Sequence, residues 1–507
     1  MSKMALNNKL IAKNTLLLYF RMIVIMLVSL YTSRVILNTL GVDDYGIYNV
    51  VGGVVAMFSF LNGAMTGVTQ RYITYTLGGN DRKRLCEVFN TSLQIHFVLA
   101  IIIFLLAETL GLWFLNTKLN IPIHRHGDAF WIYQCSILSS IVLILSIPYN
   151  ALIIAHERMQ AFAYISIVEV FLKLSIAFLL SIAPCSKVVF YSLLLLLVQI
   201  CIRFIYSTYS QRNFSECRII RFKDKKLFRE MLTFAAWNLW GGIATITCTQ
   251  GLNILLNLFF APVINAARAI SVQVQQAVLQ FATNFQTAVN PQITKLYAQG
   301  NLRPMYVLVC QSSKLSFILL FIVILPIFLE AEYILQTWLK IVPEYTCVFL
   351  RIMLCITIVD SVANPLMTAA QASGKIRLYQ IVVGGAQLLV LPFSFLVLEY
   401  GFSPSSVFVV HLLMCLVMFF VRLIIVHSLI KLPYMMYFTR VLFRCFIVMS
   451  LSSLIPIFLR LSFTDSNFTN FLVVSISAII SVITFAYLFG LNVSEKTYVL
   501  AKVKSFF

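Results

Sequence analysis

The stretch YTSRVILNTLGVDDYGIYNVVGG (31–53) ends one long apolar segment and begins the next. Arg34 lies near the end of the first segment, and Asp43 and Asp44 lie between the two. Apolar runs of this kind recur along the whole chain, each near the roughly 20 residues that cross a bilayer as a helix. The stretch therefore predicts a transmembrane helical hairpin with a permanent positive charge close to its tip.

The composition of the whole chain also indicates a membrane protein. Of its 507 residues, 60% are hydrophobic and 11% are charged, whereas soluble domains contain about 25% charged residues. The mean hydropathy is +0.92, and no segment is polar enough to form a separate soluble domain. We expect an all-α polytopic membrane protein with about fourteen transmembrane helices. The expected spans are 15–37, 46–68, 89–115, 127–155, 161–183, 188–210, 231–256, 265–290, 315–338, 347–370, 380–399, 405–428, 442–462 and 468–490.

The basic residues are divided unevenly between the two predicted faces. The net charge is +20, and most of the 38 Lys and Arg residues fall on the same side as the N-terminus. The richest segment, QRNFSECRIIRFKDKKLFRE (211–230), has seven basic and three acidic residues. Because positive loops remain in the cytoplasm, we expect both termini to be cytoplasmic. We expect this segment to contact anionic membrane lipids, and we expect no nucleic-acid partner.

The two halves of the chain resemble each other. AETLGLWFL (107–115) resembles AEYILQTWL (331–339), and IPYNALIIAHERMQAFAY (147–164) resembles NPLMTAAQASGKIRLY (364–379). An even number of spans per half inserts both halves in the same orientation, and such parallel repeats are a common transporter plan with the substrate site between them. We expect six-helix bundles at 1–220 and 221–430, followed by two additional transmembrane helices and a cytoplasmic tail at 431–507.

Few motifs in the sequence predict enzyme chemistry. Gly374 and Lys375 lack the upstream glycine and the following Ser or Thr of a phosphate-binding loop. HERMQ (156–160) has Gln160 where a zinc-protease motif requires its second histidine. The eleven cysteines are scattered and include no CxxC pair. We expect no cofactor, no metal and no enzymatic activity.

Ionisable residues inside the predicted spans are candidate functional residues, because charge in a bilayer is costly. Glu169 and Lys173 share one helix face at i and i+4, so they either form a structural ion pair or line a transport cavity. Asp360 either neutralises a buried cation or contacts a hydroxylated substrate. The cations near the inner ends of spans, where long side chains reach the headgroups, are Arg21, Arg203 and Arg422.

Arg34 and Arg268 lie near the outer ends of spans in corresponding regions of the two halves. Arg268 belongs to NAARAISVQVQQAV (265–278), where alanines leave space beside the guanidinium. This span is too polar to face lipid, and we expect it to line water or substrate. Its polar side chains are Gln273, Gln275, Gln276, Gln280, Asn284 and Gln286. Of these, Gln273, Gln276, Gln280 and Asn284 are the candidate cavity residues.

These features together resemble the Wzx-type polysaccharide flippases of the multidrug/oligosaccharidyl-lipid/polysaccharide exporter superfamily. The resemblance covers essentially the whole chain. Its most specific motif is Arg–(x)₆–Gly–x₃–Tyr-Gly, from Arg34 to Gly46. It implies two six-helix bundles in a V shape that opens alternately to either side of the bacterial cytoplasmic (inner) membrane. The implied cargo is an undecaprenyl-diphosphate-linked oligosaccharide repeat unit for a surface polymer such as O-antigen or capsule, with the polysaccharide polymerase and chain-length machinery as protein partners.

Two other members of that superfamily supply alternatives. Lipid II flippase has arginines that match Arg34 and, approximately, Arg268. It has a further arginine in the second helix, where this chain reads AMFSFLNGA (56–64) without a basic residue. Cation-coupled small-molecule and multidrug exporters usually have an acidic residue in the first or seventh helix, and both predicted helices lack one here.

The resulting hypothesis assigns the diphosphate to Arg34 and Arg268. A planar guanidinium forms bidentate, charge-assisted hydrogen bonds with phosphate, which can replace the hydration that a diphosphate loses inside the protein. Asp43 and Asp44 would form the outer rim of this site. The alternative for Arg34 is that it anchors a helix end at the headgroups.

Overall fold

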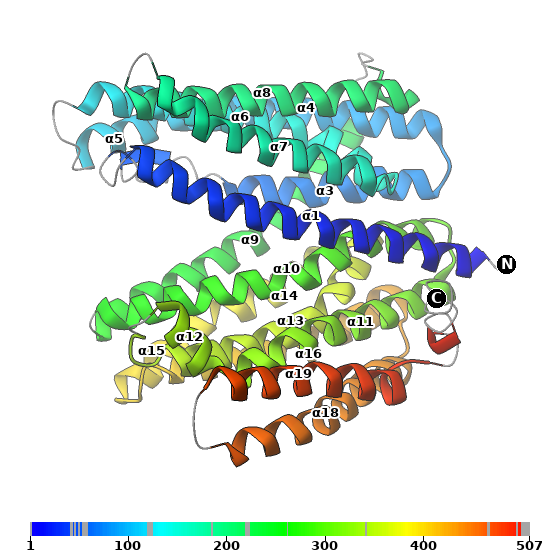
Figure 1. Cartoon of the computed structure of the whole chain (residues 1–507). Coiled ribbons are helices and arrows are strands. Elements are labelled where there is room, and N and C mark those ends of the chain that lie inside the picture. The colour runs from blue at the N-terminus through cyan, green and yellow to red at the C-terminus, as the bar shows by residue number, and fades with distance from the viewer. Residues whose placement is uncertain are drawn as a thin grey trace. The chain divides into compact units, whose positions relative to one another are not determined.

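A computed structural model of the chain describes residues 3–40, 44, 47–48, 51–52, 59–118, 125–183, 186–218, 224–260, 262–339, 342–463, 467–492 and 495–497. The regular elements in these ranges are all helices (Figure 1). The chain divides into two compact units, Met1–Leu239 and Trp240–Phe507. Twelve helices among the described residues are long and apolar enough to cross a membrane. The chain is therefore a multi-pass, all-α membrane protein, as its composition predicts.

The first unit is organised around one central helix, α6. This helix packs against α3, α4 and α8, while α1 packs against α7. The helices of the unit are α1 (Lys3–Leu40), α3 (Ser59–Gly78), α4 (Arg82–Leu106), α5 (Leu112–Lys118), α6 (His126–Ala155), α7 (Met159–Leu179) and α8 (Lys187–Asn213). The division between the units falls within α9 (Lys225–Phe259).

A π-helical turn, Ala107–Gly111, joins α4 to α5 in this unit. The hydroxyl of Tyr133 on α6 donates to the backbone carbonyl of Ala107 at 2.7 Å. A Cβ atom on Gly111 would lie 2.0 Å from the same hydroxyl. Glycine is therefore required at this position, because the tyrosine approaches the backbone closely.

The second unit repeats this plan around α13. This helix packs against α10, α11 and α16. The helices of the unit are α10 (Pro262–Ala298), α11 (Leu302–Leu329), α12 (Ala331–Leu339), α13 (Thr346–Ser373), α14 (Arg377–Leu388), α15 (Val390–Glu399), α16 (Ser406–Ile430), α17 (Tyr434–Tyr437), α18 (Phe443–Ser462) and α19 (Phe468–Phe485). Further π-helical turns are Phe438–Leu442 before α18 and Ala486–Gly490 after α19.

The two central helices share local features that the sequence repeat predicts. Pro148 lies inside α6 and Pro365 inside α13. Each helix is followed by a residue with left-handed backbone, Glu157 with φ 58° and Gly374 with φ 77°. Glycine adopts this conformation readily, whereas glutamate does so rarely. These matched features support an internal duplication, and the division into 1–220, 221–430 and 431–507 stays a proposal.

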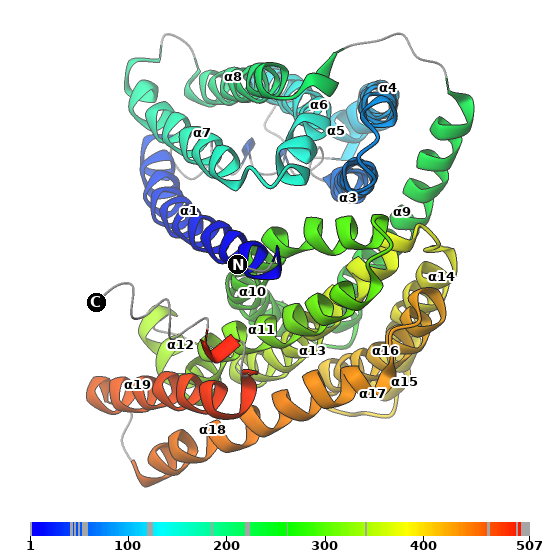
Figure 2. The ribbon, with the colours of Figure 1, turned by 90° about the vertical axis from the view of Figure 1, so that its right-hand side faces the viewer.

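The C-terminal helices α18 and α19 lie side by side and pack against α11 (Figures 1 and 2). Two ion pairs with buried members fix them there. Glu330, just after α11, pairs with Arg460 of α18 at 3.2 Å. Lys314 of α11 pairs with Glu495, beyond α19, at 2.6 Å, and its side chain is only 2% exposed. A buried charge requires its partner, so these pairs tie the last two helices to the second unit.

Fourteen spans are predicted from the sequence, and the structure differs from this prediction in places. The predicted span 46–68 lies partly outside the described residues. The span 265–290 forms part of the 37-residue α10, which is too polar to count among the twelve. The predicted span 315–338 covers two helices, because α11 ends at Leu329 and α12 begins at Ala331. Pro326 lies in the last turn of α11, and the buried pairing of Glu330 holds the chain at the break.

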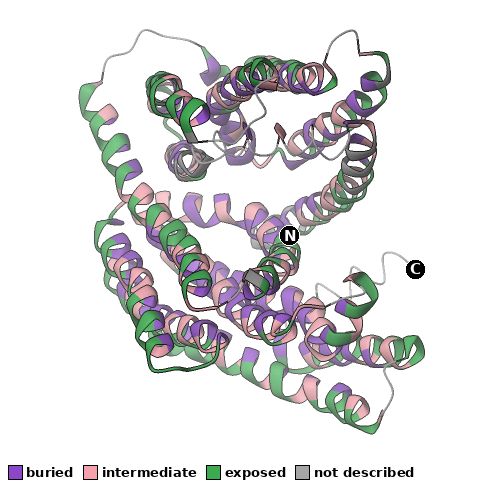
Figure 3. Ribbon diagram, turned by 90° about the vertical axis from the view of Figure 1, so that its left-hand side faces the viewer, coloured by how far each residue is buried: buried purple, intermediate pink, exposed green. Residues whose placement is uncertain are grey.

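Exposed residues occur along the helices of both units (Figure 3). Many are large and apolar, and Phe204, Leu258 and Phe458 are each 70–71% exposed. Apolar surface in contact with water costs about 25 cal/mol per Å². Such side chains are stable only where lipid surrounds them, which agrees with membrane-spanning helices.

Candidate functional site

Arg268 is a half-buried cation on α10, in the second unit. Its Nη2 donates to the backbone carbonyl of Thr249 on α9 at 2.7 Å. Its Nε is buried and has no hydrogen-bond partner. No carboxylate among the described residues forms an ion pair with this guanidinium. A guanidinium has five N–H donors, so Arg268 retains donors for an acceptor that is not part of the described protein.

The glutamines of α10 fall into two groups. Gln275 donates through Nε2 to Thr357 Oγ1 on α13 at 2.9 Å. Buried Gln286 donates to Ser316 Oγ and to the Ser361 carbonyl, each at 3.1 Å. These two side chains join α10 to its neighbours and are structural.

The second group consists of Gln273, Gln276 and Gln280, which are exposed. Their spacing of three and four residues places them along one stripe of the helix. Asn284, one turn beyond Gln280, is buried, and its Nδ2 donates to the backbone carbonyl of Gln280 at 2.8 Å. The stripe of Gln273, Gln276 and Gln280 presents amide donors and acceptors at the helix surface. Contact with lipid would leave these groups without hydrogen-bond partners. The stripe is therefore the part of α10 suited to contact water or a polar cargo.

Asp360, near the middle of α13, pairs with Arg422 of α16. The Oδ1–Nη1 distance is 3.4 Å, and the Arg422 side chain is 13% exposed. The sequence-based prediction that Arg422 extends to the headgroups is therefore wrong, because the Arg422 guanidinium forms an ion pair with Asp360 on a neighbouring helix. Of the two roles left open for Asp360, the structure shows the neutralisation of a buried cation.

Glu169 and Lys173, near the middle of α7, form the ion pair that their spacing predicts. The Nζ–Oε1 distance is 2.6 Å. Gln199 of α8 donates to the same Glu169 oxygen at 3.4 Å. The carboxylate is thus engaged on two sides within the first unit.

Arg21 and Arg203, two further arginines of the predicted spans, lie against aromatic rings of their own unit. The Arg21 guanidinium stacks 4.4 Å from the centre of the Phe162 ring and donates to Ser166 Oγ at 3.1 Å. The Arg203 guanidinium lies 4.3 Å from the centre of the Tyr149 ring. Cation–π contacts stabilise a partly desolvated arginine. Sequence reasoning missed these partners, because no local pattern connects residues on different helices.

Arg34 lies within α1, and its side chain is outside the described residues, as is Asp43. Asp44 is described, and it pairs with Arg125 at 3.0 Å. Arg125 also pairs with Asp128 at 2.8 Å, at the start of α6. Asp44 therefore has a cationic partner that the sequence analysis did not anticipate. The role of Arg34 stays a proposal.

An apolar recess of about 420 Å³ lies within the second unit, between α11, α13, α16 and α18. Its walls include Phe317, Val362, Phe419, Phe443 and Met449. The recess offers a surface for a hydrocarbon chain.

Comparison with known proteins identifies the fold. No family model matches the chain, and no curated protein matches its sequence. Solved structures match its fold, among them "Crystal structure of MATE in the straight conformation", with a TM-score of 0.70 and 13% identity over 85% of this chain and 100% of that one. The "Outward-facing conformation of a multidrug resistance MATE family transporter of the MOP superfamily" gives a TM-score of 0.72 and 13% identity over 85% and 98%. The chain has the MATE transporter fold.

The fold match agrees with the repeated packing around α6 and α13. The two MATE structures are matched over nearly their full length, while 15% of this chain remains unmatched. That share is about the size of the segment 431–507, which contains the C-terminal helices. The low identity shows a common architecture, and the cargo has to be inferred from the side chains of this chain.

Proposed function

We propose that the chain is a flippase that moves an undecaprenyl-diphosphate-linked oligosaccharide repeat unit from the inner to the outer leaflet of the cytoplasmic membrane by alternating access. The observation that carries this proposal is the balance of charges within the long helices. The mid-span acids Glu169 and Asp360 are each paired with a cation, whereas Arg268 has no carboxylate partner in the described part of the chain. This balance favours an anionic cargo over a cationic one.

The chemistry of Arg268 suits a diphosphate. The bond to the Thr249 carbonyl fixes the orientation of the guanidinium at the α9–α10 contact. The remaining N–H groups can form charge-assisted hydrogen bonds, which are about twice as strong as neutral ones. Arg34 is proposed as the second phosphate ligand, from its place in the first repeat.

The remainder of the proposed cargo is an oligosaccharide and a hydrocarbon chain. The stripe of Gln273, Gln276 and Gln280 supplies donors and acceptors for sugar hydroxyls. The apolar recess between α11, α13, α16 and α18 has the chemistry to receive part of an isoprenoid chain. A cargo with all three parts accounts for these features together.

A second candidate function is the export of a small molecule coupled to a cation. The fold favours it, because the matched structures are titled as MATE transporters and one as a multidrug resistance MATE family transporter. Coupling to a cation requires a carboxylate that is free to release and rebind it. In this chain the mid-span carboxylates Glu169 and Asp360 are both occupied by internal cations, which argues for the flippase.

Deletion of the gene separates the two functions. The flippase proposal expects an undecaprenyl-linked oligosaccharide to accumulate on the cytoplasmic leaflet, with unchanged susceptibility to cationic drugs. Unchanged lipid intermediates together with increased drug susceptibility would establish the exporter instead. Complementation by the intact gene controls for effects on neighbouring genes.

A further inference from the structure

Two adjoining polar recesses lie in the first unit at the turns that end α3 and α6. Their volumes are about 270 and 370 Å³, and both are lined by Arg82, Ser215 and Glu216. Arg158 also lines the first recess, and Lys83 lines the second. The residues come from three separate segments, so the recesses form only when these segments are held together.

The segment after α8 is fixed against the α6–α7 turn. The ring of Phe214 stacks on His156 with centroids 4.2 Å apart, and His156 Nε2 is hydrogen-bonded to Glu216 Oε1. Phe214 and Glu216 are buried. Burial, the largest single influence, raises the pKa of the Glu216 carboxyl, but the hydrogen bond and charge of His156, a backbone hydrogen bond and the Ser215 hydroxyl together outweigh it and lower that pKa. The recess walls are therefore pre-organised.

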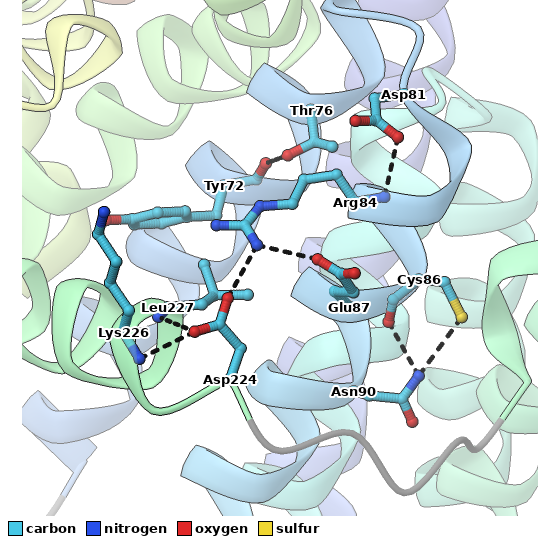
Figure 4. A network of polar contacts seen from close by, with 10 residues as sticks. All are labelled: Tyr72, Thr76, Asp81, Arg84, Cys86, Glu87, Asn90, Asp224, Lys226 and Leu227. Atoms are coloured by element: carbon cyan, nitrogen blue, oxygen red, sulfur yellow. Dashed lines mark hydrogen bonds and ion pairs between the residues drawn. The ribbon is translucent and has the colours of Figure 1, made fainter.

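The start of α9 is fixed to the same end of α4 (Figure 4). Arg84 lies between Glu87 and Asp224 in that view, with ion-pair distances of 2.9 and 3.0 Å. Asp224 Oδ1 also accepts hydrogen bonds from the backbone amides of Lys226 and Leu227. Asn90 Nδ2 donates to the Arg218 carbonyl at 2.9 Å. The residues that flank the segment 219–223, Arg218 and Asp224, are thus both bonded to α4.

The carboxylates in the recesses are already engaged, but three cations are not. Asp81 Oδ1 accepts from the Arg84 amide at 3.0 Å, Glu87 is paired with Arg84, and Glu216 is bonded to His156. The side chains of Arg82, Lys83 and Arg158 are exposed and form no ion pair with any described residue. The N–H groups of these three cations are therefore available to form charge-assisted hydrogen bonds with a multiply charged or bidentate anion.

We propose that these recesses bind the phosphate-bearing headgroup of an anionic membrane phospholipid, with Arg82 and Arg158 as its principal ligands. The recesses lie at the ends of α4, α6 and α8, which are long and apolar enough to cross a membrane, so we expect lipid headgroups near them. Basic pockets in such positions recognise anionic headgroups. None of its residues is shared with the proposed cargo site at Arg268, which belongs to the other unit. A bound lipid would link the α3–α4 turn, the α6–α7 turn and the segment between the two repeats.

The test measures lipid binding to the purified full-length protein by native mass spectrometry. The probes are dioctanoyl phosphatidylglycerol and dioctanoyl phosphatidylcholine. The protein should bind phosphatidylglycerol at least about tenfold more tightly, since one charge-assisted hydrogen bond corresponds to about that factor. The Arg82→Ala/Arg158→Ala double variant should lose this preference. Both side chains are exposed, so folding should be preserved, and the melting temperature checks it.

Arg303→Ala is the matched control. Arg303 is exposed in the first turn of α11 and occupies in the second repeat the place that Arg82 occupies in the first. Its replacement should leave lipid binding unchanged. Equal binding of the two lipids, an unaffected double variant, or an equal loss in Arg303→Ala would each overturn the proposed site. Displacement of phosphatidylglycerol by equimolar inorganic phosphate would overturn its assignment to a lipid.

Discussion

Arg268 and Arg422 are two arginines of the second unit with different partners. Arg422 reaches the carboxylate of Asp360 on a neighbouring helix, whereas Arg268 reaches a backbone carbonyl and keeps a buried Nε without a partner. A paired charge stabilises the fold only while its partner remains. We therefore expect substitution of Arg422 to affect stability, and substitution of Arg268 to affect the handling of cargo.

The Arg422→Met variant should lower the free energy of unfolding by about 2 kcal/mol. Removing one member of a fully buried pair costs roughly 3–5 kcal/mol, and the loss is smaller here because the Asp360 side chain is 39% exposed. The Arg422→Met/Asp360→Asn double variant should recover most of the loss. Chemical denaturation in detergent measures both. Equal losses in the single and double variants would show that the pair does not stabilise the protein.

Sequence spacing predicts some of these contacts and misses others. The Glu169–Lys173 pair follows from positions i and i+4 of one helix. The Asp360–Arg422 pair joins residues 62 positions apart, and it depends on the packing of α13 against α16. For the same reason the sequence could not show that Arg21 and Arg203 lie over aromatic rings. Contacts within a helix are readable from sequence, and contacts between helices require the fold.

At the scale of the element, α10 combines a structural face with an exposed polar face. Gln275 and Gln286 bind neighbouring helices, while Gln273, Gln276 and Gln280 are exposed. The sequence indicated a helix too polar for lipid, and it suggested Gln273, Gln276, Gln280 and Asn284 as the residues that line a cavity. Of these four, Asn284 is buried in the structure. The structure divides the glutamines by their partners.

The exposed face can be tested by making it apolar. The Gln273→Leu/Gln276→Leu/Gln280→Leu variant should keep its stability and abundance but lose export of the surface polysaccharide, because the cargo sugars would lose their hydrogen-bond partners. Complementation of a deletion strain measures the export. Full export by this variant would show that the stripe does not contact the cargo.

Gln275→Leu is the matched control on the same helix. Its loss leaves the bond to Thr357 unmade, so stability should fall by about 1 kcal/mol. Export per folded molecule should remain unchanged. The pair of variants thus separates a role in packing from a role in transport.

The sequence predicts the repeated helices, but it does not predict where a helix breaks. The resemblance of the segments 147–164 and 364–379 predicts two equivalent helices, which are α6 and α13 with their internal prolines. Proline alone does not predict a break, because both helices continue through it. The break after α11 also involves the pairing of Glu330 with Arg460, which lies far along the chain.

At the scale of the whole molecule, the first question is its orientation in the membrane. From the positive-inside asymmetry we propose that the segment 211–230 is cytoplasmic. A Ser215→Cys variant should react with a membrane-impermeant maleimide only after the cells are permeabilised, because Ser215 is exposed in this segment. Reaction in intact cells would reverse the proposed topology.

The neighbouring native cysteine does not interfere with this measurement. Cys217 is buried, and burial raises the pKa of its thiol to about 12. The reactive thiolate is therefore scarce at neutral pH. Replacing the exposed Cys201 by serine, together with Cys185, which lies outside the described residues, removes two further thiols that would complicate the labelling.

The central claim is that Arg268 binds the diphosphate of a lipid-linked oligosaccharide during its passage across the membrane. The most direct measurement is the rate at which the purified protein, reconstituted in liposomes, moves an undecaprenyl-diphosphate-linked oligosaccharide between leaflets. Arg268→Ala should slow this rate about 10- to 150-fold, the equivalent of one charged hydrogen bond of roughly 1.5–3 kcal/mol, and Arg268→Lys should restore only part of it. Arg303→Ala, which removes an exposed cation elsewhere in the same unit, should retain the wild-type rate. An Arg268→Ala protein that moves the lipid as fast as the wild type would contradict the account.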